Sequence, residues 1–188
     1  MNYYKENTED FIKNTINVDM TELYDIFAGQ LSVGASILDI GCGSGRDLKH
    51  FKISGFNALG LEPCHELALF ANNHSGCKVE CSTIESFDSA VKFDGIWACA
   101  SLLHLDTKSL RESFLKISSL MNKDSIFYCS FKHGEYEGER NGRFFNDQTL
   151  DSIKEILPTD LSITKSWITE DLRGNRDKRW LNLTLKLF

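Results

Sequence analysis

A glycine-rich turn between a short apolar run and a helical stretch constrains the fold of this chain more than any other feature. The apolar run Ile37-Leu38-Asp39-Ile40 is followed by glycines at alternate positions, Gly41, Gly43 and Gly45, and then by a polar segment that starts at Arg46. Glycine allows a tight turn and lets a ligand approach the main chain where a Cβ would otherwise stand. The N–H groups at the start of the next helix face an anionic group favourably. The pattern predicts a strand, a ligand-binding turn and a helix.

Apolar runs alternate with helical stretches along most of the chain. Runs that predict buried strands lie at 35–40, 57–61, 77–81, 93–100 and 125–131, and helical stretches lie at 47–51, 65–73 and 107–121. The runs at 93–100 and 125–131 are nearly continuous, as expected of strands buried on both faces. Strands that alternate with helices are joined by right-handed crossovers and form a parallel sheet.

The two ends of the chain have other patterns. Leucines alternate with polar residues over 181–187, and 161–169 is a looser run of the same kind, so the two are predicted to pair as an antiparallel hairpin. The charged connection 170–179 holds a Gly-Asn turn signal and charges of both signs, which favours internal ion pairs over an anion site. Residues 3–30 hold two helix-like stretches, with Thr21 or Asp19 as the N-cap of the second.

Length and charge limit the classes of partner. A chain of 188 residues predicts one domain, and its net charge of −6 comes without a basic stripe, so a nucleic-acid partner is disfavoured. No run approaches the roughly 18 apolar residues of a membrane span, and the polar, acidic N-terminus is neither a signal nor a transit peptide.

The cysteines indicate the compartment. Six cysteines are scattered without any Cys-x-x-Cys pair, which predicts reduced thiols in a cytoplasmic protein. Cys77 and Cys81 lie near His74 but lack a fourth ligand at suitable spacing, so no metal site is predicted.

An acidic residue closes the second predicted strand. Glu62 follows the glycines by about twenty residues, where a carboxylate accepts hydrogen bonds from both hydroxyls of a ribose. The alternative is a glutamate that stabilises the start of the helix beyond Pro63. Arg46 stands where the dinucleotide fingerprint has its last glycine. A pyrophosphate-binding loop, and with it a nicotinamide-dependent oxidoreductase, is therefore disfavoured.

Together these segments resemble the class I S-adenosylmethionine-dependent methyltransferases over nearly the whole chain. Asp39-x-Gly41-x-Gly43-x-Gly45 is similar to the first motif of that family, 59–62 to the second and 93–98 to the fourth. The closest resemblance is to small, single-domain bacterial members, of the tellurite-resistance-like or methyltransferase type 11 and 12 groups. The resemblance implies a Rossmann-like α/β fold: a seven-stranded, mostly parallel sheet with one antiparallel C-terminal strand and helices on both faces. Residues 1–188 would form a single methyltransferase domain, with 1–30 as a helical cap over the cofactor site.

The resemblance also implies a set of contacts to S-adenosylmethionine. Asp39 would lie near the amine or the sulfonium, the glycine loop near the methionine portion, and Glu62 at the ribose. The backbone at Thr83 and Ile84 would meet the adenine, although the third strand lacks the aspartate that many members place there. The full cofactor-binding set predicted in this way is Tyr4, Asp39, Gly41, Cys42, Gly43, Gly45, Arg46, Glu62, Pro63, Thr83, Ile84, Ala98 and Cys99.

Two members of this set carry open alternatives. Arg46 would pair with the methionine carboxylate, or it is a solvated arginine in the first turn of a helix. Tyr3 and Tyr4 would fold over the cofactor as a lid, or they dock a helix. The carbonyls of Ala98 and Cys99 would accept hydrogen bonds from the amine.

The reacting side is predicted from residues that follow the fourth and fifth strands. His104 lies at the carboxyl edge of the sheet and is the candidate catalytic base; the alternative is a histidine that caps the following helix. Residues 133–145 form a polar, glycine-punctuated loop in which Arg140 and Arg143 are candidate substrate residues for an anion. The alternative there is an exposed loop with solvated charges.

The predicted function is transfer of a methyl group from S-adenosylmethionine to a small-molecule acceptor. No Asn/Asp-Pro-Pro-aromatic motif follows the fourth strand, where Ala98-Cys99-Ala100-Ser101 stands, and no catalytic cysteine pair is present. Both absences disfavour base methylation of nucleic acids. The alternatives are a non-catalytic S-adenosylmethionine-binding subunit or sensor, and a methyltransferase that acts on a protein or RNA. A monomer or weak homo-oligomer is expected.

Overall fold

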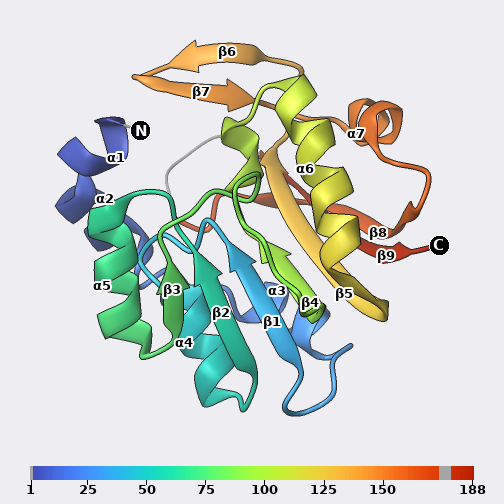
Figure 1. Cartoon of the computed structure of the whole chain (residues 1–188). Coiled ribbons are helices and arrows are strands. Elements are labelled where there is room, and N and C mark those ends of the chain that lie inside the picture. Colours follow the sequence, from blue (N-terminus) through green and yellow to red (C-terminus); the bar gives the residue numbers. More distant parts are fainter. Residues whose placement is uncertain (1, 174–178) are drawn as a thin grey trace.

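One seven-stranded sheet organises the molecule. The computed structural model describes residues 2–173 and 179–188, and the sheet has the strand order β3-β2-β1-β4-β5-β9-β8 (Figure 1). β9 is antiparallel to both of its neighbours, whereas the other strand pairs of this sheet are parallel. The bounds are Ser36–Ile40 (β1), Asn57–Leu61 (β2), Lys78–Glu80 (β3), Phe93–Ala98 (β4), Met121–Lys132 (β5), Leu161–Glu170 (β8) and Arg179–Leu187 (β9). The predicted sheet, including its antiparallel C-terminal strand and hairpin, is confirmed.

Helices cover both faces, as predicted. They are Asn2–Glu6 (α1), Thr8–Thr15 (α2), Thr21–Ala28 (α3), Arg46–Ile53 (α4), His65–Ser75 (α5), Thr107–Leu120 (α6) and Leu150–Ile156 (α7), with a short 3-10 helix at Leu102–His104 (η1). The N-terminal region holds three helices rather than the two predicted. The N-cap of α3 is Met20, so the prediction of Thr21 or Asp19 at that position is wrong. Asp19 accepts hydrogen bonds from the backbone amide and the hydroxyl of Thr21 at 2.9 and 2.6 Å, one residue before the N-cap. Within the described residues, no helix combines the length and apolar character that a bilayer span requires.

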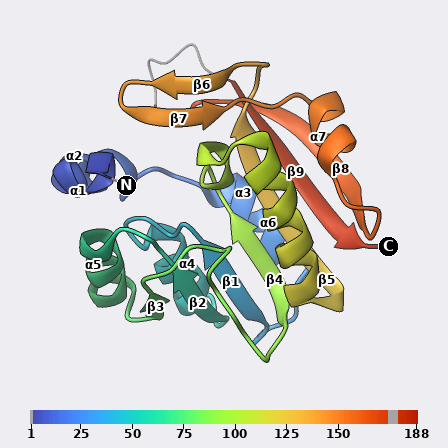
Figure 2. The same ribbon diagram turned by 45° about the horizontal axis from the view of Figure 1, so that its top comes forward.

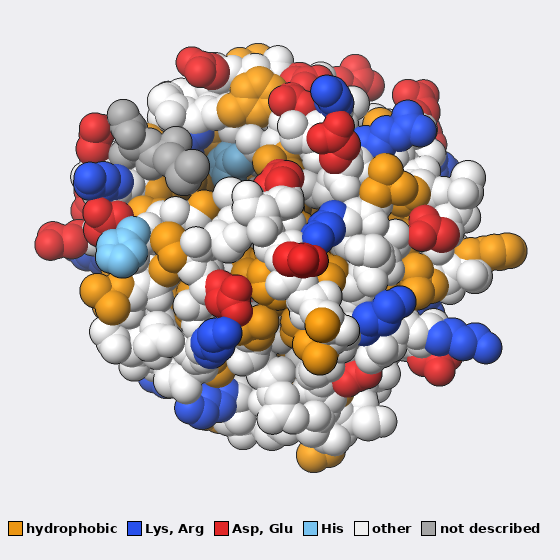
Figure 3. Space-filling view, in the orientation of Figure 1, with side chains coloured by type: hydrophobic (Ala, Val, Ile, Leu, Met, Phe, Trp, Pro, Cys, Tyr) orange, Lys and Arg blue, Asp and Glu red, His pale blue; other side chains and the backbone are white. Residues whose placement is uncertain are grey.

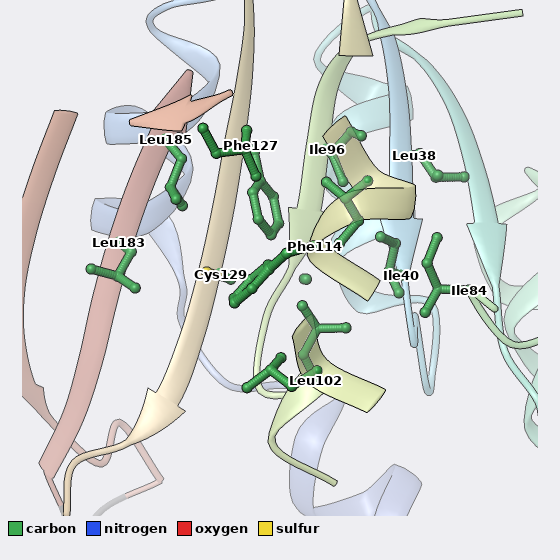
Figure 4. Close-up of a cluster of buried hydrophobic side chains, with 14 of the residues drawn as sticks. Leu38, Ile40, Ile84, Ile96, Leu102, Phe114, Phe127, Cys129, Leu183 and Leu185 are labelled. Atoms are coloured by element: carbon green, nitrogen blue, oxygen red, sulfur yellow. The ribbon is translucent and has the colours of Figure 1, made fainter. Parts of the chain in front are cut away.

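The central strands are buried on both sides, because successive side chains point to opposite faces. Leu38, Ile96 and Phe127 pack against Phe114 of α6 (Figure 4), within a cluster that also includes Ile153 of α7. Their neighbours Ile37 and Trp97 face the other way and pack against α3 and α4. This alternation explains why the strand runs are nearly continuously apolar in the sequence.

The segment that follows β5 is folded into a hairpin, whereas the sequence predicted a loop. Glu137–Arg140 (β6) pairs antiparallel with Arg143–Asn146 (β7). The turn residues Asn141 and Gly142 have φ of 51° and 73°. Asn-Gly favours this left-handed pair of conformations, so the sequence held a hairpin signal that the loop prediction did not use. The Gly-Asn turn predicted within 170–179 lies outside the described residues.

The strand order reverses between β1 and β4, which are neighbours in the sheet although their crossovers run to opposite sides. In open α/β sheets, ligands bind beyond the carboxyl ends of the strands at such a reversal. Figures 1 and 2 show the β6–β7 hairpin across this end of the sheet and α1 and α2 to one side of it. The fold therefore encloses its candidate site between the sheet, the N-terminal helices and the hairpin.

Candidate functional site

A cavity of about 550 Å³ lies at the carboxyl ends of β1 and β4. The predicted site residues that line it are Tyr4, Gly41, Cys42, Gly43, Arg46, Glu62, Pro63, Thr83, Ile84, Cys99, His104, Arg140 and Arg143. Asp39, Gly45 and Ala98 are not among its lining residues. Lining residues that the sequence did not predict include Phe11, Thr15, Ser130 and Lys132, whereas Ser101 and Phe145 lie in segments expected to face the acceptor. Of these, Lys132 is the last residue of β5. Its position at the carboxyl edge of the sheet, where Glu62 also lies, could have predicted it as a site residue.

The glycine loop lies close to the segments around it. The amides of Gly41 and Cys42 donate to the Leu61 carbonyl at 2.8 and 2.9 Å, which joins the loop to β2. Gly43 has a φ of 54°, and a Cβ there would lie 2.9 Å from the ring of Phe11. At Gly45 a Cβ would instead lie 2.9 Å from Ala71 of α5. Gly43 therefore faces the cavity, whereas Gly45 allows α5 to pack against the loop.

Glu62 connects the end of β2 to both neighbouring turns. Its carboxylate accepts hydrogen bonds from the amides of Gly43 and Cys64, each at 2.9 Å. Burial raises the pKa of Glu62, and the two backbone hydrogen bonds oppose that rise. Each carboxylate oxygen retains a second acceptor site. Glu62 thus supports the start of α5, as the alternative interpretation expected, and still has acceptor capacity for ribose hydroxyls.

Asp39 is a buried carboxylate with an unsatisfied oxygen. It is 1% exposed, and its Oδ2 has no hydrogen-bond partner among the described residues; the same is true of Oγ of the cavity-lining Ser101. Burial, followed by repulsion from Asp47, raises the pKa of Asp39 well above its usual range. A cationic amine nearby would satisfy this oxygen and reverse the effect. The residues present therefore fit S-adenosylmethionine, and the predicted positions of its ammonium near Asp39 and of its ribose near Glu62 stay predictions.

Replacing Asp39 by asparagine is expected to stabilise the ligand-free chain while weakening cofactor binding about tenfold. A raised folded-state pKa means that the folded state binds the proton more tightly, so stability falls as pH rises above the unfolded value near about 4. Asp39→Asn removes that loss. The increase in the free energy of unfolding relative to the unchanged protein should therefore be larger at about pH 8 than at about pH 5. Denaturant unfolding at both pH values and calorimetry with S-adenosylhomocysteine measure the two effects.

Asp94 offers a matched control on the neighbouring strand. Its carboxylate accepts from the amide and hydroxyl of Ser36 at 2.9 and 2.8 Å, and these bonds hold its pKa below the usual value. Asp94→Asn should therefore destabilise the fold and leave cofactor affinity unchanged. A loss of stability at about pH 8 in Asp39→Asn would contradict the buried-charge argument.

Arg46 lines the cavity but is held by its neighbour. Its Nε and Nη2 donate to the two oxygens of Asp47 at 2.6 and 3.0 Å, and Nη1 donates to the Thr15 carbonyl at 3.3 Å. Asp47 also accepts from Tyr24 and from the Trp97 indole. The alternative of a solvated arginine is wrong, because this guanidinium is paired and largely buried. Pairing with a methionine carboxylate stays a prediction.

His104 joins the N-terminal helices to the hairpin. Its Nδ1 lies 2.7 Å from the Phe144 carbonyl and its Nε2 lies 2.8 Å from the Tyr4 hydroxyl. Because a carbonyl only accepts, Nδ1 carries the proton and Nε2 accepts from Tyr4. Burial lowers the pKa of His104 to about 4, which keeps the ring neutral. The side chain that caps α6 is Asp106, whose carboxylate accepts from the Ser109 amide at 2.8 Å, so the helix-capping alternative for His104 is wrong.

The two predicted substrate arginines have different surroundings. Arg140 forms an ion pair with Asp147 and lies over the rings of Tyr136 and Phe145. Arg143 lies over the ring of Tyr3 at 4.4 Å and over that of Phe145 at 5.0 Å. Both are half-buried parts of the cavity wall, so the alternative of an exposed loop with solvated charges is wrong for them.

Known proteins share the fold of this chain. A family model described as a methyltransferase domain matches residues 13–156. A Burkholderia thailandensis 1,6-didemethyltoxoflavin-N1-methyltransferase, solved with that compound and S-adenosylhomocysteine, is 17% identical; the match covers 99% of this chain and 86% of that one, with a TM-score of 0.78. A Bradyrhizobium japonicum N-methyltransferase with bound S-adenosylhomocysteine is 14% identical, with coverage of 100% and 99% and a TM-score of 0.76.

Two further relatives extend the comparison. Magnesium protoporphyrin IX methyltransferase from Synechocystis, solved with S-adenosylmethionine, is 16% identical, with coverage of 100% and 85% and a TM-score of 0.71. An uncharacterised protein of Methanocaldococcus jannaschii is 29% identical over 110 residues, which are 55% of this chain but only 39% of that relative. None of these relatives is described as a tellurite-resistance protein, so that subgroup stays a prediction. With the family model matched over residues 13–156, the chain belongs to the methyltransferase-domain family, as a class I S-adenosylmethionine-dependent member.

Proposed function

We propose that this chain transfers the methyl group of S-adenosylmethionine to a small-molecule acceptor, as one domain over residues 1–188. The observation that carries the proposal is one cavity lined by two chemically distinct groups of residues. The first group is the glycine loop and Glu62, which follow β1 and β2, and the second is His104, Lys132 and Arg143, which lie after β4, at the end of β5 and on the hairpin. A volume of about 550 Å³ lies within the range of small-molecule sites. The relatives that act on didemethyltoxoflavin and on magnesium protoporphyrin IX support an acceptor of this class.

The main task of the protein in methyl transfer is to align the acceptor atom with the methyl group. S-adenosylmethionine supplies an activated methyl group for an in-line displacement. The residues of this chain orient the acceptor and exclude water. Tyr4, Phe11 and Thr15 of the N-terminal helices line the cavity, and we propose that residues 1–30 act as the cap that closes it. Loops and helices that close over a site perform this role in many enzymes.

Labelled methyl transfer tests the proposal. The protein is first titrated with S-adenosylhomocysteine by calorimetry. It is then incubated with methyl-labelled S-adenosylmethionine and separate low-molecular-weight, protein and RNA fractions of a cell extract. We expect label in the low-molecular-weight fraction. Label in protein or RNA would contradict the acceptor class. Cofactor binding without transfer to any fraction would favour a non-catalytic binding subunit.

His104 is expected to position Tyr4 and the hairpin rather than to transfer a proton. The pH dependence of the free energy of unfolding tests this role. The folded-state pKa of His104, about 4, lies below the ordinary value of 6.5, so the unfolded state takes up the proton more readily. Stability that is full above about pH 6.5 is lost by up to about 3 kcal/mol as pH falls toward 4. His104→Asn should flatten that dependence and keep kcat within a few-fold. Urea unfolding between about pH 4 and pH 7.5 measures the slope.

His65, exposed on α5, is the control for this prediction. His65→Asn should leave the free energy of unfolding at about pH 7.5 and kcat unchanged, because the substitution is on the surface. The competing role is general base catalysis, in which His104→Asn would lower kcat by about 10²–10⁴ and remove the acidic limb of the pH–rate profile. That outcome would contradict the positioning role.

We extend the proposal to the setting of the chain. The cysteines at 42, 64, 77, 81, 99 and 129 are free thiols, which supports a reducing, cytoplasmic compartment. Lys, Arg, Asp and Glu side chains are interspersed over the face shown in Figure 3, which supports a monomer or weak homo-oligomer without a nucleic-acid partner. Light scattering and a polynucleotide-binding assay test these two points.

A further inference from the structure

The arginines of the cavity differ in how their charge is balanced. Arg46 pairs with Asp47, Arg140 with Asp147 and Arg173 with Asp171. Arg143 lines the same cavity, and the described part of the chain places no carboxylate oxygen within 4.0 Å of it. Its Nε is buried and has no hydrogen-bond partner among the described residues. A half-buried cation without a counter-charge among the described residues is costly, so its partner is expected from a ligand.

The surroundings of Arg143 are aromatic and include a second cationic side chain, Lys132. The Arg143 guanidinium lies 4.4 Å from the centre of the Tyr3 ring and 5.0 Å from that of Phe145, and the Lys132 ammonium lies 3.7 Å from the centre of the same Phe145 ring. The hydroxyl of Tyr4 lies at the edge of hydrogen-bond range, 3.5 Å from Nη1, and burial raises its pKa, so it stays neutral and does not compensate the charge. After burial, Arg143 and Lys132 are the causes that lower the pKa of His104, which reports the same positive field.

This field is local. The chain as a whole carries a net charge of −6, and the Arg140–Asp147 pair beside Arg143 is neutral. The charge of Arg143, which no carboxylate of the described residues balances, attracts a small anion to this part of the cavity wall. The flat guanidinium can donate two parallel hydrogen bonds to a carboxylate or phosphate, and the aromatic rings offer faces for a planar acceptor.

We propose that the methyl acceptor is a small anion that carries a carboxylate or phosphate group beside a planar ring, and that Arg143 selects it. The inference rests on the proposed methyl transfer and names the class of acceptor for the same site. Arg143 binds the anionic group at the hairpin side of the cavity, while the acceptor atom faces the glycine loop. The β6–β7 hairpin thereby becomes the element that sets acceptor specificity.

Binding of matched probes tests this proposal. Calorimetry compares benzoate, phenyl phosphate and uncharged benzamide on protein saturated with S-adenosylhomocysteine. We expect at least one of the two anions to bind about tenfold tighter than benzamide, and the comparison of the two shows which anionic group is preferred. Arg143→Gln should remove the preference for the anion and leave the affinity for S-adenosylhomocysteine within about threefold. Arg143→Lys, which keeps the charge but not the planar fork, should retain part of it.

Arg111→Gln is the control, because Arg111 is exposed on α6. It should keep the full anion preference. Equal affinity for the anions and benzamide, no binding of either anion at about 10 mM, or an unchanged preference in Arg143→Gln would each overturn the proposal. Binding of S-adenosylhomocysteine is measured first, and its failure would count against the proposed function rather than against the role of Arg143. In that case the probes are compared on the cofactor-free protein, and the same criteria apply to Arg143.

Discussion

Gly43→Val is expected to lower the affinity for S-adenosylhomocysteine by at least about 100-fold, or about 2.7 kcal/mol. The Cβ alone would lie 2.9 Å from Cε1 and 3.1 Å from Cζ of the Phe11 ring. Phe11 belongs to α2, a helix without buried residues, so the ring can be displaced. The branched side chain would then hold the cap away from the loop and occupy cavity volume that the methionine portion needs. Calorimetry measures the affinity, and thermal unfolding shows that the chain still folds.

Gly34→Val separates this effect from backbone strain. Gly34 also has a left-handed φ, 81°, but a Cβ there meets nothing within 4 Å. Both variants should lose about 1–3 kcal/mol of stability from the strained conformation. Affinity should fall in Gly43→Val alone. Normal cofactor binding by folded Gly43→Val would show that the loop does not hold the ligand, and an equal loss of affinity in both variants would assign the effect to stability.

Local patterns were sufficient to predict the sheet. The run at 57–61 matches β2 residue for residue, and the leucine alternation over 181–187 identified β9 as the strand that breaks the parallel pattern. Both signals are short-range patterns of apolar residues, which a single sequence displays. The alternation in β9 does not mark an exposed face, because Asn182 and Thr184 between the leucines are each 1% exposed. The β6–β7 hairpin was missed because its strands are short and polar, and its Asn-Gly turn was the sole strong signal.

Contacts between distant segments account for what the sequence did not predict in the site. Motif spacing predicted the glycine loop and Glu62 as site residues, and both line the cavity because they follow the adjacent strands β1 and β2. The partnership of Tyr4 with His104 joins residues 100 positions apart, and no periodicity encodes it. The same holds for Asp47, which collects hydrogen bonds from Tyr24, Arg46 and Trp97. Such buried polar groups find partners wherever the tertiary fold brings donors together.

The N-terminal helices contact the site at separate points along the sheet edge. Tyr4 contacts His104 beyond β4, Phe11 contacts the loop after β1, and the Thr15 carbonyl accepts from Arg46 at the start of α4. Because each contact involves a predicted site residue, a ligand that moves one of them also moves the cap. Cofactor binding and cap closure are therefore expected to be coupled, and this coupling is one reason why a change at Gly43 has a large effect.

Glu62→Ala is expected to lower the affinity for S-adenosylhomocysteine by about 10–150-fold, or about 1.5–3 kcal/mol, because two ribose hydroxyls would lose their acceptor. It should also destabilise the ligand-free fold by about 2–4 kcal/mol. The carboxylate is 6% exposed and satisfies the buried amides of Gly43 and Cys64, which alanine would leave unpaired. Calorimetry and denaturant unfolding measure the two losses.

Two variants distinguish ribose binding from structural support. Glu62→Gln keeps one carbonyl oxygen for a backbone amide, so it should recover part of the lost stability while affinity stays low, since the amide group cannot accept from both hydroxyls. Glu80→Ala removes a carboxylate at the end of the adjacent strand β3, where its partner is the exposed Lys78. An exposed pair of this kind contributes little, so stability should change by less than about 1 kcal/mol and affinity should not change. An affinity loss below about threefold in Glu62→Gln, with the fold intact, would remove the ribose role and leave Glu62 as the residue that ties the glycine loop to α5.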